Sequence, residues 1–228
     1  MKGKLIVIEG TDSSGKGTQL DLLVKRLEEN DVRYKTFDFP RYDSEHGKKV
    51  GEYLDSDPKN PNQRDPYDIS KEYAEDRLEV KLDIEKWLDE GYFVLCNRYV
   101  ESNKGHQGAR IQDEEERRKY LEWIDDLEYN INGMPRADLM VFLYLPYELG
   151  QLIIESKPKR EYTDKKKDLH EGDPEHLKKA EQTYLELAKK EGWYKVDCAK
   201  LGWTVRKDDI HKEEYIHEMV WKEVKKLI

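Results

Sequence analysis

The chain has few cysteines, no long apolar run and no excess of positive charge. Its two cysteines, Cys96 and Cys198, lie inside short apolar runs, so we expect buried thiols and no disulfide framework. No stretch approaches the ~18 apolar residues of a membrane span, and no amino-terminal stretch resembles a signal peptide. We therefore expect a cytoplasmic protein that has no membrane partner.

Positive charge is outweighed overall, since 50 Asp and Glu residues exceed 41 Lys and Arg residues and the formal net charge is −9. A general nucleic-acid binder needs a basic field, so we expect no nucleic-acid partner and only local basic sites. Charged residues make up 40% of the chain, yet 15 tyrosines and 5 tryptophans supply large rings for a core. Neither a repeat nor a Ser/Gly-rich linker divides the 228 residues, and we expect one domain over 1–228.

Short apolar runs alternate with longer segments of helical spacing. The runs are typical of strands and cover residues 5–8, 34–39, 93–96, 139–145 and 194–198. Three segments have helical spacing. They run from Leu20 to Leu27, from Tyr73 through Leu82 to Trp87, and over residues 209–228. The alternation predicts a three-layer α/β/α fold with a central five-stranded parallel sheet and ligands at the carboxyl ends of its strands.

A glycine-rich segment follows the first apolar run directly and precedes a helical pattern. Gly10 and Gly15 allow positive φ, so backbone amides can turn inward around anionic oxygens, and the next helix adds its partial positive charge. Lys16 adds a full charge. This context predicts a site for the phosphates of a nucleoside triphosphate, formed by Gly10, Thr11, Asp12, Ser13, Ser14, Gly15, Lys16, Gly17 and Thr18.

The segment departs from the usual phosphate-loop pattern at one position. Ser or Thr normally follows the Gly-x-x-x-x-Gly-Lys spacing, but this chain has Gly17 there. The hydroxyl arrives one residue later on Thr18, which we predict as a Mg²⁺ ligand.

Arginines follow two further predicted strands at the same edge of the sheet. Arg41 and Tyr42 end the second run, while Arg98 and Arg110 lie in the segment 97–110 after the third. These arginines can face shared phosphate groups, or each can form an ordinary surface ion pair.

Tyr73 and Arg77 are four residues apart and share one helix face. A ring beside a guanidinium suits a planar base that offers a carbonyl oxygen. Alternatively, Tyr73 packs in the core and Arg77 pairs with a neighbouring acidic residue.

Two segments interrupt the alternation of strands and helices. Residues 55–66 contain three prolines and are typical of an exposed loop. Residues 156–174 are basic and are either a solvated charge run or a mobile segment that closes over a ligand.

In combination these motifs resemble the thymidylate kinase family of P-loop nucleoside monophosphate kinases. The resemblance runs from Lys4 to about Ala188 and rests on residues 9–19, 39–42, 73–77, 97–110 and 168–171. The Gly-Lys-Gly-Thr-Gln ending of the loop is equally similar to adenylate kinases. The Arg-Tyr-Val-x-Ser-Asn run and the Tyr-x-x-x-Arg pair are similar to the thymidylate branch.

The resemblance implies transfer of the γ-phosphoryl group of ATP to dTMP, giving dTDP and ADP, with Mg²⁺ as cofactor. It also implies a homodimer. Lys16 and the loop amides would hold the donor phosphates, and Asp12 would reach the acceptor sugar or the metal. The implied acceptor-binding residues are Asp12, Arg41, Tyr42, Tyr73, Arg77, Arg98, Asn103, His106 and Arg110.

Among these, the resemblance assigns more specific contacts. Arg41 and Arg98 would grip the acceptor phosphate. Tyr73 would stack on thymine, and Arg77 and Asn103 would bond its edge.

The family places catalytic cations in the phosphate loop or in a lid. Here the loop has Ser13 and Ser14, so the resemblance implies that residues 156–174 form the lid, with Arg160, or Lys157 and Lys159, supplying the charge. The expected catalytic residues are Lys16, Asn97, Arg98 and Arg160.

Two positions depart from the family pattern. Asn97 stands where the family usually has Asp, so a carboxylate expected near Mg²⁺ is missing, and we consider Glu9 as its substitute. His106 stands where the family often has a tyrosine that crowds the sugar 2′ carbon.

Three other functions compete with thymidylate phosphorylation. The chain could phosphorylate another nucleotide or a deoxynucleoside, or bind nucleotides with impaired catalysis because of Asn97. A GTPase-type switch is disfavoured, because the Asp-x-x-Gly at 12–15 lies within the loop itself and Asn103-Lys104 lacks the following x-Asp.

Overall fold

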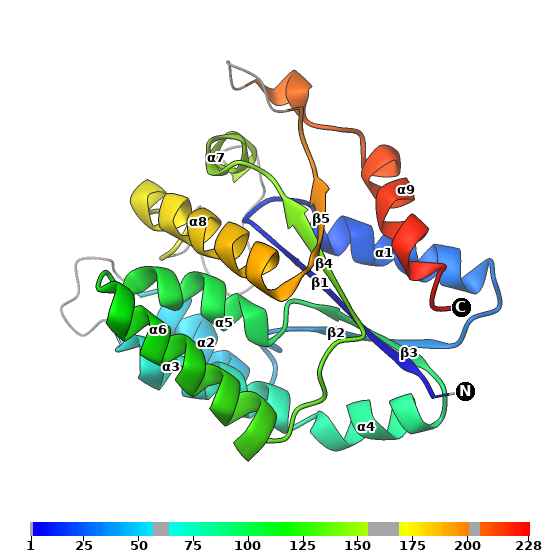
Figure 1. Ribbon diagram of the computed structural model, residues 1–228, viewed down its shortest axis with the longest axis horizontal. Helices are drawn as coiled ribbons and strands as arrows, with labels where there is room; N and C mark the ends of the chain where they lie inside the picture. Colours follow the sequence, from blue (N-terminus) through cyan, green and yellow to red (C-terminus); the bar gives the residue numbers. More distant parts are fainter. Residues whose placement is uncertain (1, 57–63, 155–168, 201–205) are drawn as a thin grey trace.

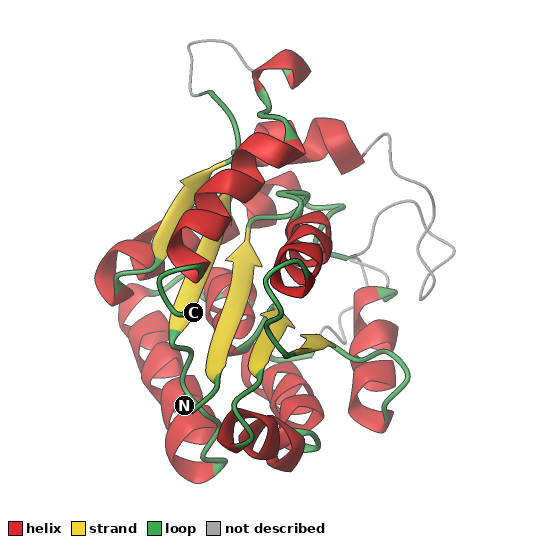
Figure 2. Cartoon of the chain, turned by 90° about the vertical axis from the view of Figure 1, so that its right-hand side faces the viewer, coloured by secondary structure: helices red, strands yellow, loops and turns green. Residues whose placement is uncertain are grey.

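Five parallel strands form the centre of the computed structural model, which describes residues 2–56, 64–154, 169–200 and 206–228. Their order across the sheet is β2-β3-β1-β4-β5, and each neighbouring pair is parallel; Figure 2 shows the twisted sheet between the helices. The strands are β1 (Lys4–Gly10), β2 (Tyr34–Asp38), β3 (Phe93–Asn97), β4 (Leu139–Tyr144) and β5 (Tyr194–Asp197). The predicted five-stranded parallel sheet is therefore confirmed.

Helices cover both faces of this sheet (Figure 1). Those of the described residues are α1 (Lys16–Glu28), α2 (Glu45–Leu54), α3 (Pro66–Leu78), α4 (Lys81–Asp89), α5 (Val100–His106), α6 (Glu114–Asp125), α7 (Tyr147–Ile154), α8 (Pro174–Glu191) and α9 (Glu213–Val224). Short helical turns are η1 (Gly108–Arg110), η2 (Asp126–Ile131) and η3 (Lys207–Asp209).

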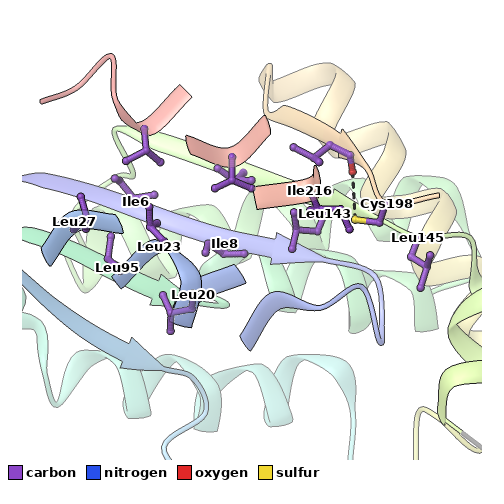
Figure 3. Packing of buried hydrophobic residues seen from close by; sticks show 14 of the residues in the cluster. Ile6, Ile8, Leu20, Leu23, Leu27, Leu95, Leu143, Leu145, Cys198 and Ile216 are labelled. Atoms are coloured by element: carbon purple, nitrogen blue, oxygen red, sulfur yellow. Dashed lines mark hydrogen bonds between the residues drawn. The ribbon is translucent and has the colours of Figure 1, made fainter. Parts of the chain in front are cut away.

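One face of the sheet packs against α1 and α9. Side chains alternate along a strand, so Ile6 and Ile8 of β1 both point to this face. They pack with Leu20 and Leu23 of α1 in a fully apolar cluster, which Figure 3 shows from close by. The burial fixes the direction of α1, whose first turn therefore begins at the carboxyl end of β1.

The opposite face is covered by α4, α5 and α8. Leu5 and Val7 of β1 point this way and join Ile84 of α4 in a second buried cluster. Phe142 of β4 stacks on Tyr184 of α8 with ring centroids 5.6 Å apart. The three-layer α/β/α arrangement predicted from the sequence is thus confirmed.

The helical pattern between Tyr73 and Trp87 is not one helix, contrary to our expectation. The chain leaves helical geometry at Val80, which caps α4 with φ −108° and ψ 7° and is buried against β-strand residues. Leu82 is consequently 77% exposed instead of facing the core. Periodicity alone did not reveal the break, because the spacing continues across it.

Both thiols are buried and free, as predicted, and burial raises the pKa of each. Among the described residues, no helix combines the length and the apolar character that crossing a membrane requires.

Candidate active site

The loop between β1 and α1 is shaped by close packing and by left-handed backbone conformations. A Cβ atom at Gly10 would lie 2.5 Å from the carbonyl oxygen of Leu143, so only glycine fits there. Gly15 has φ 89° and Ser13 has φ 63°. The Thr11 hydroxyl accepts a bond from the Leu145 amide and donates to its carbonyl, which ties the loop to the end of β4.

Helix α1 begins at Lys16 without a side-chain cap. The amides of its first turn therefore have no partner within the helix and can meet an anion. The Lys16 ammonium lies over the loop, donating to the carbonyl oxygens of Gly10 at 2.8 Å and Thr11 at 3.0 Å. Loop, lysine and helix end together present the amide donors and the positive charge that a phosphate group requires, and we call them the phosphate cradle.

Arg98 links the loop to α5. It follows β3 directly and has a left-handed backbone with φ 66°, an unusual conformation for a non-glycine residue. Its Nη2 donates to Asp12 Oδ1 at 3.0 Å, and its Nη1 lies 3.3 Å from Nε2 of His106. Contacts between Asp12, Arg98 and His106 thus connect the loop after β1, the end of β3 and helix α5 at the carboxyl edge of the sheet.

The protonation states of Asp12, Arg98 and His106 follow from their burial and from the charged groups beside them. Burial raises the pKa of Asp12, but a protonated His106, Arg98 and Lys16 lower it, and it lies well below its usual range. Burial lowers the pKa of His106 to about 3, although Asp12 acts in the opposite sense. At neutral pH the site therefore contains ionised Asp12 and Arg98 beside an uncharged imidazole.

Two pockets meet at Asp12 and Arg98. The first, which we call the tyrosine pocket, encloses about 500 Å³ of empty space, part of which is open solvent. It is lined by Asp12, Pro40, Tyr42, Leu54, Tyr73, Arg98, Ser102, Asn103, His106, Gln107 and His170. Aromatic rings with a few polar groups suit a planar, partly polar ligand.

The second pocket, which we call the loop pocket, encloses about 1140 Å³ of empty space, part of which is open solvent. It contains residues 12–19 together with Asn97, Arg98, Leu145, Ile153, Glu171, Cys198, Ile210, His211, Glu213 and Ile216. The phosphate cradle occupies one part of its wall, and the segment after β5 provides apolar side chains. Asp12 and Arg98 belong to both pockets, so ligands in the two pockets would meet at this pair.

The structure brings most of the predicted site residues to these pockets. From the loop, residues 12–18 line the loop pocket, Thr18 included. The acceptor candidates Tyr42, Tyr73, Arg98, Asn103 and His106 line the tyrosine pocket.

Of the predicted acceptor-binding arginines, Arg41, Arg77 and Arg110 line neither the tyrosine pocket nor the loop pocket. Arg41 donates to the backbone oxygen of Asp76 at 2.8 Å and pairs with Glu79, both in or beside α3. Arg110 stacks over the Tyr53 ring at 5.6 Å and bonds Gln107. In this structure neither points to the phosphate cradle.

Arg77 lies behind the tyrosine pocket and is 1% exposed. Its Nε donates to Glu128 of η2 at 3.0 Å, and its Nη2 lies 3.3 Å from Oδ1 of Asn103. Arg77 therefore orients Asn103, which does line the pocket. Sequence reasoning missed Glu128, because its partner is 51 residues away.

Glu9 is fully buried and bonds protein donors. Its carboxylate accepts bonds from the Tyr99 amide at 2.8 Å, the Ser102 hydroxyl at 2.8 Å and the Tyr184 hydroxyl at 3.3 Å. The hypothesis that Glu9 replaces a carboxylate at position 97 is thus not favoured, since these bonds hold Glu9 between β1, α5 and α8.

Asn97 has a carboxylate beside it. Its Nδ2 donates to Asp38 Oδ1 at 2.9 Å across strands β2 and β3. Sequence reasoning did not select Asp38, because only the pairing register places it next to Asn97.

Part of the predicted lid falls outside the described residues, including Lys157, Lys159 and Arg160. The part from 169 onward is described. Leu169 packs against Val50 and Leu54, His170 lines the tyrosine pocket, and Glu171 lines the loop pocket. The latter two were in the motif at 168–171 but were not among our selected site residues.

The family model for thymidylate kinase matches residues 8–210. A thymidylate kinase from Plasmodium falciparum is 27% identical over 226 residues, covering 99% of this chain and 91% of that protein. One from Desulfotalea psychrophila is 32% identical over 167 residues, or 71% of this chain and 73% of that protein.

Among solved structures, thymidylate kinase from Candida albicans superimposes with a TM-score of 0.71 at 25% identity, covering 99% of this chain and 92% of the other. The five-stranded parallel α/β fold agrees with this structural match. The chain therefore belongs to the thymidylate kinase family.

Proposed function

We propose that this protein transfers the γ-phosphoryl group of ATP to dTMP, giving dTDP and ADP. The observation that carries the proposal is that Asp12 and Arg98 line both pockets. A triphosphate in the loop pocket and a monophosphate in the tyrosine pocket would therefore meet at one arginine. Family membership supports the choice of dTMP as acceptor.

Phosphoryl transfer needs positioning and charge stabilisation more than covalent help. Lys16 and the amides at the start of α1 would hold the donor phosphates. Arg98 would contact the acceptor phosphate, with Asp12 fixing the orientation of its guanidinium at 3.0 Å. This arrangement would bring together two anions that otherwise repel each other.

The tyrosine pocket offers groups for a pyrimidine nucleotide. The Tyr73 ring would pack on the base, and Asn103, oriented by Arg77, would bond its edge. Uncharged His106 would lie beside the sugar, and Tyr42 would close the pocket near the phosphate.

Magnesium fits the loop pocket chemically. Mg²⁺ is usually held by one or two protein oxygens, water and substrate phosphates, not by an all-protein cage. Accordingly, no group of three or more His, Cys, Asp or Glu side chains in the described part of the chain is arranged to hold a metal. Thr18 lines the pocket, and the buried Oδ1 of Asn97 has no hydrogen-bond partner in the structure. Bound Mg²⁺ would neutralise charge on the phosphates.

Four further features are proposed from sequence and family. Residues 1–228 form one kinase domain, and residues 156–174 act as its lid. Arg160 supplies the catalytic cation that Ser13 and Ser14 do not. The protein is a cytoplasmic homodimer.

The test is an ADP-release assay with dTMP, AMP and thymidine as separate acceptors. We expect dTMP to be phosphorylated at least about tenfold faster than either alternative. Lys16→Ala should lower turnover at least about 100-fold, because removing one preorganised charge near a developing anion costs that much.

Lys25→Ala is the matched control, since Lys25 lies exposed on the same helix. It should keep wild-type turnover, and both variants should keep the wild-type circular dichroism. Faster phosphorylation of AMP or thymidine would contradict the choice of acceptor, and unchanged activity of Lys16→Ala would contradict the donor site.

A further inference from the structure

Asp38 and Asn97 are direct neighbours at the carboxyl ends of β2 and β3. The strand register pairs their Cα positions, and the Asn97 amide nitrogen donates to Asp38 Oδ1 at 2.9 Å. The bond fixes the orientation of the amide, because only its nitrogen can donate to a carboxylate.

The other end of the same amide is unsatisfied. Asn97 is 9% exposed, and its Oδ1 is buried without a hydrogen-bond partner in the structure. A buried acceptor without a hydrogen bond reduces the free energy of unfolding by about 1–3 kcal/mol. An ion or a water molecule that binds there can supply the missing partner. Asn97 lines the loop pocket together with Lys16 and Arg98.

Asp38 lies in the same electrostatic environment. Burial raises the pKa of Asp38, whereas its hydrogen bond to Asn97 and the charges of Arg98 and Lys16 lower it. Both cations of the proposed phosphate site therefore act on this carboxylate. Asp21 of α1 is the acidic group that also faces it.

We propose that Asp38 supplies the negative charge for nucleotide-bound Mg²⁺, with Asn97 as its neutral partner, in place of the aspartate that the family usually has at position 97. The inference rests on the proposed function. Asp38 acts through the water shell that Mg²⁺ retains, and the free Oδ1 of Asn97 accepts a bond from that shell. The carboxylate has thus moved by one strand, from β3 to β2.

The proposal also explains why position 97 carries an amide. A second carboxylate there would replace the donor that Asp38 now bonds, placing two like charges in contact. Neighbouring carboxylates raise each other's pKa, and one of them protonates. We therefore expect Asn97→Asp alone not to strengthen metal binding, whereas exchanging the two side chains should preserve it.

Mn²⁺ binding to the ADP complex tests the exchange without relying on turnover. Free Mn²⁺ is measured by electron paramagnetic resonance during titration of wild type, Asp38→Asn, Asn97→Asp and the double exchange. We expect Asp38→Asn to weaken Mn²⁺ binding about tenfold, the size typical of losing a group that orients the ligands of a metal. The double exchange should return to within about threefold of wild type.

Asp31→Asn is the control, because Asp31 is exposed and precedes the amino end of β2, away from the loop. It should leave Mn²⁺ binding unchanged. Wild-type Mn²⁺ affinity in Asp38→Asn overturns the proposal, as does a double exchange that binds as weakly as Asp38→Asn. Failure of the proposed function is seen separately, as wild-type protein that binds Mn²⁺ and ADP but does not phosphorylate dTMP.

Discussion

Arg98 is the residue on which both pockets depend. Its backbone has φ 66°, and its amide donates to the Ile8 carbonyl at 3.0 Å, which holds the residue in this sparsely populated conformation. Such conformations cost about 1–3 kcal/mol and persist where the surrounding structure enforces them. Here the turn directs the guanidinium back over the sheet edge to Asp12 instead of along α5.

His106 is held in its uncharged form by the surrounding structure. Burial lowers the pKa of His106 to about 3. Its ring stacks on the His170 ring with centroids 5.6 Å apart, and burial also lowers the pKa of His170. The unfolded chain binds a proton near pH 6.5. Between that pH and 3 the unfolded state holds the extra proton, so stability falls as the solution becomes more acidic, by at most about 1.4 kcal/mol per pH unit from His106.

We therefore expect His106→Gln to lose less unfolding free energy than wild type between neutral pH and about pH 5. Urea denaturation at both pH values measures the difference. Lys25→Gln, on the exposed face of α1, should keep the acid sensitivity of the wild type. An equal loss in His106→Gln and wild type would contradict an uncharged, buried His106.

At this scale the sequence predicts a residue's surroundings only where its partners lie close to it in the chain. The turn at residues 10–18 could be predicted, because it is built from consecutive residues whose conformations are local; its contact with phosphate groups stays a prediction. Arg41 and Arg77 were assigned to direct ligand contact, but their partners Glu79 and Glu128 are brought in by packing between elements. No local pattern reveals those pairings.

At the scale of elements, η2 supports the floor of the tyrosine pocket from behind. Its Glu128 is fully buried against Arg77, which in turn contacts the Tyr99 carbonyl and Asn103. Removing one partner of a buried ion pair leaves an uncompensated charge. The helix pair α3 and α5 is thus held at this side by one guanidinium.

We expect Glu128→Gln to reduce the free energy of unfolding by about 3 kcal/mol. It should also raise the KM for dTMP more than the KM for ATP, because Asn103 loses its orientation. Urea denaturation and steady-state kinetics measure the two effects. Glu122→Gln on the exposed face of α6, where Glu122 pairs with Arg118, should change neither. An unaltered dTMP KM would show that Arg77 does not act through Asn103.

The elements themselves were largely predictable, and the exceptions have physical causes. All five strands were found, since β1, β3 and β4 are short apolar runs, and β2 and β5 place aromatic or aliphatic residues among polar ones. The division between α3 and α4 was missed, because burial of Val80 in the core outweighs the helical spacing around it. The six-residue turn η2 carries no apolar pattern that would set it apart from α6.

For the whole molecule, charge is separated between surface and site. The net charge of −9 disfavours anions in general, while Lys16 and Arg98 concentrate positive charge at one edge of the sheet. Anionic ligands can therefore bind where the local field is positive, although the chain as a whole is negative. The parallel order of the strands creates this edge, because the carboxyl ends of β1, β2 and β3 all lie there.

We propose that the loop pocket and the tyrosine pocket form one site for two nucleotides. Calorimetric titration with adenosine and thymidine joined through five phosphates tests whether both pockets bind one ligand. Linked ligands that occupy both pockets gain about 10²–10⁴-fold over either part alone. We predict at least about 100-fold tighter binding than ATP or dTMP, and no such gain for two adenosines joined in the same way. A thymidine-containing conjugate that binds no more tightly than ATP would contradict the account.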